Sequence, residues 1–287
     1  MTQQSGWHDN PQDRSQLGCR EAVIWSSDVT PKVRPTVDRS DRGSPCAASP
    51  GRARGSRAAR GRHTQETVMK SFSRLPKHIG IIPDGNRRWA QRKGLKKQDG
   101  YESGLQPGLE LYELCLELGI KELTFYGFTV DNTKRPSVQI GAFQKACVDA
   151  VEYLASKDTD LLVVGNTQSR FFPKALLSYT KRTRFGSGLI KVNFLANYGW
   201  NWDLNYSVQN GVISSSGNII DGIASSDISR IDLIIRWGGG RRLSGFLPIQ
   251  SVYADFYVVD EMWPDYSIEQ VYKALEWYQD QDITLGG

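Results

Sequence analysis

The sequence predicts an α/β protein in which helices flank a mostly parallel, six-stranded sheet. Two observations support this class. Short apolar runs alternate with stretches of helical periodicity, and turn residues separate them, an order that favours parallel strands joined by helices. No internal repeat is present, so a repeat architecture is not expected. The six predicted strands are residues 79–83, 123–128, 161–165, 190–196, 231–235 and 256–259.

The helices between these strands are predicted from the spacing of apolar residues along one face. Their predicted positions are residues 87–92, 105–116, 138–156, 173–181, 201–210 (a short helix) and a last helix near residue 270. The residues expected to face the core are Leu105, Leu109, Tyr112 and Leu116 in the second of these helices, and Ile268, Val271, Tyr272 and Leu275 in the last.

Charge is distributed unevenly along the 287 residues. Residues 1–70 hold 12 Lys and Arg against 7 Asp and Glu, a net charge of +5 that equals the net charge of the whole chain. Residues 71–287 are therefore neutral, with 24 residues of each sign. The first 70 residues are rich in Ser, Gly, Pro and Arg and lack apolar periodicity, so we expect a disordered basic tail before one folded domain at 71–287.

Three origins of this tail are compared. An arginine-rich arm can bind nucleic acid through phosphates, but residues 51–62, its densest part, have no interleaved aromatic residues, and the tail contains seven acids. A transit peptide would contain fewer acids. Because Met69 stands just before the folded part, we favour upstream sequence that is not normally made, and we expect no nucleic-acid partner.

Cysteine usage and hydropathy indicate a cytoplasmic protein. The spacing of the four cysteines fits no metal site, so we expect reduced thiols. The sequence has no run of 18 apolar residues and no signal-peptide pattern, so no transmembrane segment is expected. The cysteines are Cys19, Cys46, Cys115 and Cys147.

The first predicted strand ends in a turn that suits an anion. Asp84, Gly85 and Asn86 are turn residues, and Arg87 and Arg88 open the helix that follows. The first N–H groups of a helix lack helical partners, and glycine lets a phosphate approach the backbone closely. Arginines are unfavourable at this end of a helix unless an anion is bound. A capped turn with a solvated basic face is the commoner arrangement, but this combination of residues favours a phosphate site, where Asp84 would be a ligand for Mg²⁺.

A second cationic stretch follows the fifth predicted strand. Arg236, Arg241, Arg242 and Ser244 surround three consecutive glycines. The glycines allow a nest of N–H groups, and arginine pairs well with phosphate oxygens. The alternative is a flexible loop with solvated arginines. We favour an anion site because clustered like charges repel one another unless an anion lies between them.

These two stretches, and the polar loop at 129–136, each follow a predicted strand. In a parallel sheet, ligands bind outside the carboxyl ends of the strands, so the three segments are expected along one edge. No P-loop and no dinucleotide-binding glycine motif is present. Two phosphate sites on one edge therefore indicate two diphosphate substrates rather than one nucleotide.

Residues 84–90, Asp-Gly-Asn-Arg-Arg-Trp-Ala, resemble the signature of the cis-prenyltransferases, the undecaprenyl diphosphate synthase family, with Pro83 in place of the usual Met. Residues 236–244 resemble the family's Arg-Thr-Gly-Gly-Glu-x-Arg-x-Ser motif. Matching pieces occur in order from about residue 76 to 287. The resemblance implies the family's fold, a homodimer, Mg²⁺ as cofactor, and transfer of a prenyl group from an allylic diphosphate to isopentenyl or dimethylallyl diphosphate.

The resemblance also implies roles for the matched residues. The implied catalytic residues are Asp84, Asn86 and Asn132, and the implied metal ligands are Asp84 and Asp255. The implied substrate-binding residues are Gly85, Asn86, Arg87, Arg88, Trp89, Lys97, Tyr101, Thr129, Arg135, Arg236, Arg241, Arg242 and Ser244. The candidate residues of a hydrocarbon tunnel are Phe143, Ala146 and Cys147, each of which is also a common core residue.

Several positions depart from the family's motifs. Tyr101 stands where the family has a His, Thr133 where it has a Trp, and Gly240 where it has a Glu. The change from His to Tyr leaves open which group accepts the final proton. The Pro-Asp-Gly-x-Arg-Arg-Trp and Asp-Gly-Tyr segments also resemble the lavandulyl and cyclolavandulyl diphosphate synthases, which couple two allylic units. We therefore expect a short-chain or irregular product rather than a long polyprenyl carrier.

Two other functions are considered. A terpene-forming lyase on the same fold would need only the first phosphate site, so the retained Arg236, Arg242 and Ser244 argue for two substrates. A non-catalytic subunit of a heteromeric prenyltransferase would lose the Asp-Gly-Asn turn, which this chain keeps.

Overall fold

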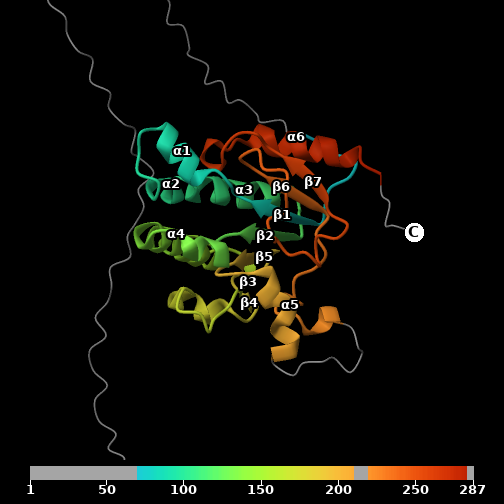
Figure 1. Cartoon of the computed structure of the whole chain (residues 1–287). Coiled ribbons are helices and arrows are strands. Elements are labelled where there is room, and N and C mark those ends of the chain that lie inside the picture. Colours follow the sequence, from blue (N-terminus) through green and yellow to red (C-terminus); the bar gives the residue numbers. More distant parts are fainter. Residues whose placement is uncertain (1–69, 210–218, 283–287) are drawn as a thin grey trace, which may run out of the picture. The chain divides into compact units, whose positions relative to one another are not determined.

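The sheet at the centre of the fold has seven strands in the order β4-β3-β5-β2-β1-β6-β7 (Figure 1). The computed structural model describes residues 70–209 and 219–282, so residues 1–69 of the predicted tail lie outside the described residues. All neighbouring strands are parallel except β3 and β4, which are antiparallel. The strands are β1 (His78–Ile82), β2 (Glu122–Tyr126), β3 (Thr159–Val164), β4 (Thr183–Arg184), β5 (Ile190–Leu195), β6 (Leu233–Arg236) and β7 (Asp255–Val258).

The predicted α/β class and its six parallel strands are confirmed, but the predicted strand count is one too low. The missed strand, β4, has only two residues and pairs Thr183 with Leu161 and Arg184 with Asp160. It contains no apolar run, so the periodicity used to predict strands has nothing to detect there.

The helices largely follow the predicted positions. The α-helices are α1 (Asn86–Arg92), α2 (Asp99–Glu102), α3 (Leu105–Glu117), α4 (Ser137–Ala155), α5 (Trp200–Gln209) and α6 (Ile268–Gln279), and the 3₁₀-helices are η1 (Val130–Lys134), η2 (Lys174–Tyr179), η3 (Ile219–Gly222) and η4 (Trp263–Asp265). The helix predicted at 173–181 is thus a 3₁₀-helix. Within the described residues, no helix is long and apolar enough to cross a membrane.

Each face of the sheet carries its own apolar core. Along β1, Ile79 and Ile81 face a core shared with α3, α4 and α6, whereas Ile82 faces a second core beneath the loops that precede and follow β6. This alternation follows from the two-residue period of a strand. A Cβ on Gly80 would lie 2.6 Å from the Phe246 ring, so the second core packs directly on the β1 backbone.

The predicted buried face of α3 is only partly correct. Tyr112 is buried, together with Leu111 and Leu114, which the spacing did not select. Leu105 and Leu109 are half-buried and instead line an apolar pocket described below. The helix is therefore apolar on two adjoining faces, one for the core and one for the pocket.

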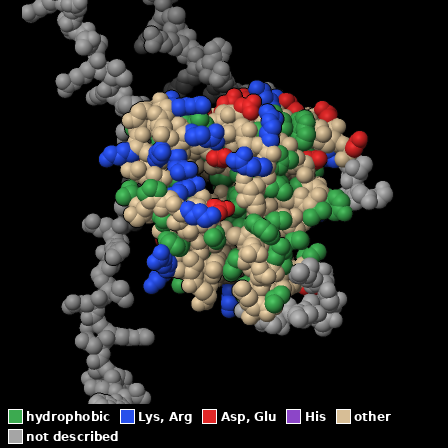
Figure 2. Space-filling view, viewed as in Figure 1, with side chains coloured by type: hydrophobic (Ala, Val, Ile, Leu, Met, Phe, Trp, Pro, Cys, Tyr) green, Lys and Arg blue, Asp and Glu red, His purple; other side chains and the backbone are tan. Residues whose placement is uncertain are grey.

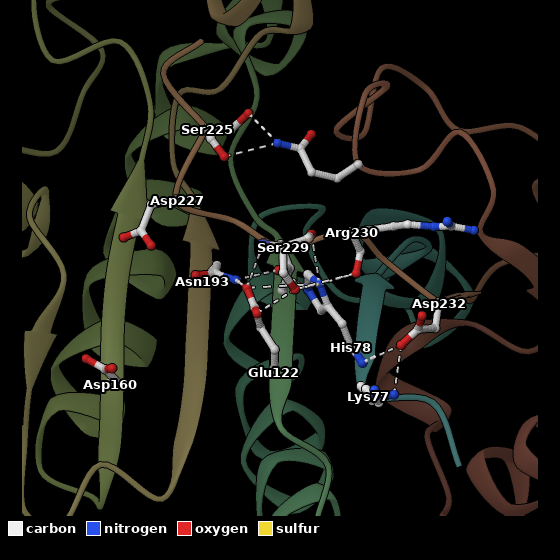
Figure 3. A network of polar contacts seen from close by, with 12 residues as sticks. Lys77, His78, Glu122, Asp160, Asn193, Ser225, Asp227, Ser229, Arg230 and Asp232 are labelled. Atoms are coloured by element: carbon white, nitrogen blue, oxygen red, sulfur yellow. Dashed lines mark hydrogen bonds and ion pairs between the residues drawn. The ribbon is translucent and has the colours of Figure 1, made fainter. Parts of the chain in front are cut away.

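A buried polar network joins β1, β2 and β5 to the segment before β6 (Figure 3). Glu122 accepts hydrogen bonds from Asn193 Nδ2 at 2.7 Å and from Ser229 Oγ at 2.7 Å. The ring of His78 places Nδ1 within 3.2 Å of the carbonyl oxygens of Ser229 and Arg230, so Nδ1 carries the hydrogen, and Nε2 accepts from Thr124 Oγ1 at 2.7 Å. The buried groups of the network therefore satisfy one another.

The network makes the fold sensitive to acid. Burial lowers the pKa of His78 and keeps its ring neutral. Burial opposes it, but the hydrogen bonds that Ser229 and Asn193 donate lower the pKa of Glu122. Both shifts favour the deprotonated form in the folded state, so both contribute stability that is lost as the pH falls below the pKa of each group in the unfolded chain.

We expect the free energy of unfolding to decrease between pH 6.5 and pH 4. In this range His78 and then Glu122 bind protons more readily in the unfolded chain than in the folded protein, which favours unfolding. The Glu122→Gln variant should be about 1–3 kcal/mol less stable at pH 7, because its amide cannot accept all the hydrogen bonds of the carboxylate. Its stability should then decrease less on acidification than that of the wild type. Urea unfolding at several pH values measures this, with the exposed Glu117→Gln as control. Equal acid dependence in the wild type and Glu122→Gln would contradict the role of the network.

Candidate active site

A cleft of about 480 Å³ opens at the carboxyl ends of β1, β2 and β6. Ile82 lies opposite Arg236 in the parallel register, so the turn after β1 starts beside the end of β6. This brings together the two cationic stretches that are far apart in sequence. The predicted site residues that line the cleft are Asp84, Gly85, Asn86, Arg87, Arg88, Lys97, Tyr101, Thr129, Asn132, Arg135, Arg236, Arg242 and Ser244.

The centre of the cleft is an ion pair between the two stretches. Arg236 Nη2 donates to Asp84 Oδ2 at 2.9 Å, and Arg88 Nη2 lies 3.4 Å from Asp84 Oδ1. The Arg236 side chain is buried, and its Nη1 donates to Ser244 Oγ at 2.9 Å and to the carbonyl oxygen of Arg242. Arg236 is thus held by three hydrogen bonds, and its buried Nε–H lacks an acceptor among the described residues.

The turn after β1 has the geometry that its glycine predicts. Gly85 has a φ of 111° and a Cβ there would lie 2.8 Å from Met262, so a side chain is disfavoured both by conformation and by space. No side chain caps the first turn of α1, and that turn contains no acid. Arg88 Nη2 also donates to the carbonyl oxygen of Gly238 at 3.0 Å, which joins α1 to the glycine-rich loop.

The opposite wall is built from α2, α4 and the loop after β2. Arg135 Nη1 donates to the hydroxyl of Tyr101 at 2.7 Å, and the Tyr101 ring stacks on Phe143 with centroids 4.4 Å apart. Burial raises the pKa of Tyr101 despite the nearby Arg135, so the phenol stays protonated at neutral pH. Asn132 Oδ1 accepts from the backbone N–H of Thr129 at 3.0 Å, which fixes the loop after β2.

Charge in the cleft is strongly positive. Six cationic side chains line it, from residues 87, 88, 97, 135, 236 and 242, against two carboxylates, from residues 84 and 131, which leaves +4. The space-filling view shows Lys and Arg side chains gathered on the same side of the domain, over α1 and α2 (Figure 2). Such a field concentrates polyanionic ligands at the mouth of the cleft.

Three predicted site residues lie outside this cleft. Trp89 points away and donates from Nε1 to Asp265 Oδ1 at 2.7 Å. Arg241 is exposed, with Nη2 3.7 Å from Asp260 Oδ1. Asp255 begins β7 in register with Leu233, so it lies at the amino-terminal edge of the sheet, whereas Asp84 follows the carboxyl-terminal edge. The two acids therefore cannot share a metal ion within one chain.

An apolar pocket adjoins the cleft. Its volume is about 70 Å³, and it shares Pro83, Asn86, Tyr101, Gly127 and Phe143 with the cleft, so the two spaces meet. Its remaining walls come from α3, α4, two strands and η4, namely Gly104, Leu105, Gly108, Leu109, Phe125, Ala146, Cys147, Ala150, Leu154, Phe194 and Trp263. The predicted tunnel residues Phe143, Ala146 and Cys147 thus all line it.

Some of the lining residues were not predicted. Tyr126 ends β2 and its hydroxyl donates to the carbonyl oxygen of Ser244 at 2.8 Å, so a polar residue at the carboxyl end of a strand was the signal that could have found it. Trp263 lies more than 170 residues from Asp84 in the sequence, yet its backbone N–H donates to the Asp84 carbonyl oxygen at 3.0 Å. No local pattern points to that contact.

A cationic cleft that opens into an apolar pocket suits a ligand with a diphosphate at one end and a hydrocarbon at the other. The comparisons with known proteins agree with this geometry. The sequence model described as "Putative undecaprenyl diphosphate synthase" matches residues 82–286. This chain belongs to the undecaprenyl diphosphate synthase, or cis-prenyltransferase, family and is a prenyl-transferring enzyme.

Bacterial relatives match most of the chain. The ditrans,polycis-undecaprenyl-diphosphate synthase ((2E,6E)-farnesyl-diphosphate specific) of Aliivibrio fischeri is 30% identical over 233 residues, which cover 75% of this chain and 90% of that protein. An isoprenyl transferase of Streptococcus mutans is 32% identical over 239 residues, covering 75% of this chain and 95% of that protein. Among solved structures, lavandulyl diphosphate synthase from Lavandula x intermedia, in complex with dimethylallyl diphosphate, matches with a TM-score of 0.63 and 22% identity, covering 74% of this chain and 98% of that chain. That likeness supports the fold.

The placement of Trp89 outside the cleft can be tested. We expect Trp89→Phe to lower the free energy of unfolding by about 1 kcal/mol, because it removes one partly exposed hydrogen bond. The KM values for diphosphate substrates should not change. Asp265→Asn, which keeps a hydrogen-bond acceptor, is the control. A large rise in KM without loss of stability would contradict this placement and would mean that Trp89 contacts the substrate.

Proposed function

We propose that this enzyme couples an allylic prenyl diphosphate to a second isoprenoid diphosphate in an Mg²⁺-dependent reaction and gives a short-chain or irregular product. One observation carries the proposal. The Asp84 turn meets Arg236, the last residue of β6, across 2.9 Å in one cleft, which Arg242 also lines and which opens into an apolar pocket. Two diphosphates and one hydrocarbon chain can therefore be bound side by side.

The proposed reaction breaks the allylic C–O bond of the donor, and the electron pair leaves with its diphosphate. The double bond of the second isoprenoid attacks the allylic carbon, a new C–C bond forms, and the resulting cation loses a proton. The arginines and Lys97 stabilise the charge that grows on the departing diphosphate. The apolar pocket holds the prenyl chain and excludes water from the allylic cation.

The donor set of the cleft fits Mg²⁺. Among the described residues no group of three His, Cys, Asp or Glu side chains could hold a metal ion, and Asp84 is the carboxylate at the centre of the cleft. Mg²⁺ is commonly bound by one or two carboxylates with substrate phosphates and water completing its shell. We propose Asp84 as its protein ligand. The ion would neutralise charge on the diphosphate oxygens when bound.

Two features support a short hydrocarbon donor. The apolar pocket of about 70 Å³ is far smaller than the cleft of about 480 Å³, so it favours a short hydrocarbon over a long one. The lavandulyl diphosphate synthase with the same fold binds dimethylallyl diphosphate. We propose dimethylallyl diphosphate as the allylic donor and leave the acceptor to the experiment below.

We also propose that the enzyme works as a homodimer in the cytoplasm. Trp200 and Val208 expose 50% and 69% of their surface on α5, and large apolar residues exposed on one helix are suited to contact with a second copy. Asp255 could take part in metal binding only if a second copy brought it to the cleft, because it lies at the opposite edge of the sheet from Asp84.

The two alternative functions are less well supported. A lyase that ionises a single diphosphate would not need Arg242 and Ser244, which line the same cleft as Arg87 and Arg88. A non-catalytic subunit would not need the intact turn that holds Asp84 against Arg236.

We expect Asp84→Asn and Asp84→Ala to abolish turnover. Asp84→Asn keeps an acceptor for Arg236, so the fold should remain intact, whereas Asp84→Ala leaves a buried guanidinium without its partner. Calorimetry of inorganic pyrophosphate binding, with and without Mg²⁺, gives a second measure. The wild type should bind more tightly with Mg²⁺ and Asp84→Asn should not. The exposed Asp260→Asn is the control, and full activity of Asp84→Asn would refute the metal role.

We expect Arg242→Ala to raise the KM of the second substrate chiefly. The loss of a charge-assisted contact of about 2 kcal/mol corresponds to a roughly thirtyfold higher KM. The exposed Arg241→Ala serves as the matched control. Equal effects on both substrates would mean that Arg242 does not distinguish between the two diphosphate sites.

Incubation with dimethylallyl diphosphate alone, and then with isopentenyl diphosphate added, tests the reaction itself. Products are identified after dephosphorylation. A coupled product from dimethylallyl diphosphate alone would establish irregular coupling, and a product that requires isopentenyl diphosphate would establish regular elongation. No coupled product under either condition would overturn the proposed function.

A further inference from the structure

Three glycines at intervals of four residues, Gly100, Gly104 and Gly108, lie in α2, just before α3 and in α3. Two of them are explained by the protein's own packing. A Cβ on Gly100 would lie 2.1 Å from the carbonyl oxygen of Asn86, and a Cβ on Gly104 would lie 2.5 Å from Asn86 Oδ1. At those two positions a side chain would clash with the turn that carries Asn86.

Gly108 has no such explanation. A Cβ there would meet its nearest neighbours, Trp263 and Phe125, at 3.8 and 3.9 Å, which are ordinary contact distances. The residue lies inside α3, where alanine is considerably more favourable than glycine. Its φ is not positive, so the backbone conformation does not require glycine either. The fold alone would therefore accept, and gain stability from, a methyl group at this position.

The space left by Gly108 belongs to the apolar pocket. The residue is one of its lining residues, between Leu105 and Leu109 on α3 and facing the rings of Trp263 and Phe125. In a pocket of about 70 Å³, one added methyl group removes a large part of the available volume. The missing side chain is thus accounted for by a ligand that needs this space.

We propose that Gly108 is a specificity-determining residue, whose missing side chain admits the methyl-branched end of a five-carbon allylic donor. The inference rests on the proposed function, because it assigns the apolar pocket to the donor's hydrocarbon. It goes further by naming the position that sets the width of the pocket. The diphosphate of the donor would stay in the cleft, out of reach of residue 108.

The test compares Gly108→Ala with Gly141→Ala in the full-length chain. Gly141 lies in α4, and a Cβ there meets nothing within 4 Å, so this control carries the same change in helix preference without touching the pocket. Both variants should raise the Tm by about 2–4 °C, because both replace glycine by alanine within a helix. Only Gly108→Ala should weaken the binding and turnover of dimethylallyl diphosphate.

For Gly108→Ala we expect kcat/KM with dimethylallyl diphosphate to fall by about 10–200-fold, the usual effect of one carbon atom in an apolar pocket. Calorimetry with the unreactive thiolodiphosphate analogue of this donor should show a similar loss of affinity. The affinity for inorganic pyrophosphate should be unchanged, since it reports the cleft alone.

The outcomes distinguish a failure of the proposed function from a failure of the role assigned to Gly108. If the wild type binds the thiolodiphosphate analogue no better than pyrophosphate, the proposed function fails and this inference fails with it. If the wild type prefers the analogue and Gly108→Ala retains that preference to the same degree as Gly141→Ala, the proposed function stands and the role of Gly108 is overturned. A loss of pyrophosphate affinity in Gly108→Ala would also overturn it, because the effect would then lie in the cleft.

Discussion

The ion pair between Asp84 and Arg236 is the contact on which the site depends. The two residues come from neighbouring parallel strands whose register places Ile82 opposite Arg236, so the turn after one strand meets the end of the other. Because the Arg236 side chain is buried, its charge requires nearby acceptors, and the turn supplies one of them. The arrangement of the sheet therefore fixes the position of the cationic cleft.

Tyr101 and Phe143 separate the polar and the apolar parts of the site. The Tyr101 hydroxyl accepts a hydrogen bond from Arg135, while its ring stacks on Phe143 and contributes to the apolar pocket. An aromatic residue with a polar end can serve both environments at once. The boundary between the cationic cleft and the apolar pocket thus lies at one pair of rings.

Most of the fold was predictable because its strands are short apolar runs separated by turn residues. The convergence of Asp84, the Thr129 loop and Arg236 was also predictable, since carboxyl ends of parallel strands share an edge. Residues whose position depends on side-chain direction were not. Trp89 occupies the predicted helix but turns toward Asp265, and a sequence pattern alone does not show to which neighbour a half-buried indole will donate.

The other departures have similar causes. Asp255 stands where the family has a metal-binding Glu, but its place at the start of β7 depends on strand register, which local sequence does not reveal. The strand β4 pairs with β3 through two residues and has no periodicity of its own. The face of α3 was mispredicted because apolar residues also line the pocket, and periodicity does not distinguish a pocket from a core.

The position of Trp263 affects how the protein is made. This residue lines the apolar pocket and its backbone N–H donates to the carbonyl oxygen of Asp84, although it lies more than 170 residues after Asp84 and more than 100 residues after α4 in the sequence. The ribosome therefore releases the cationic turn, α3 and α4 long before the indole that completes their enclosure. Until Trp263 has been synthesised, the apolar sides of α3 and α4 lack this cover, and a chaperone can bind them during that interval.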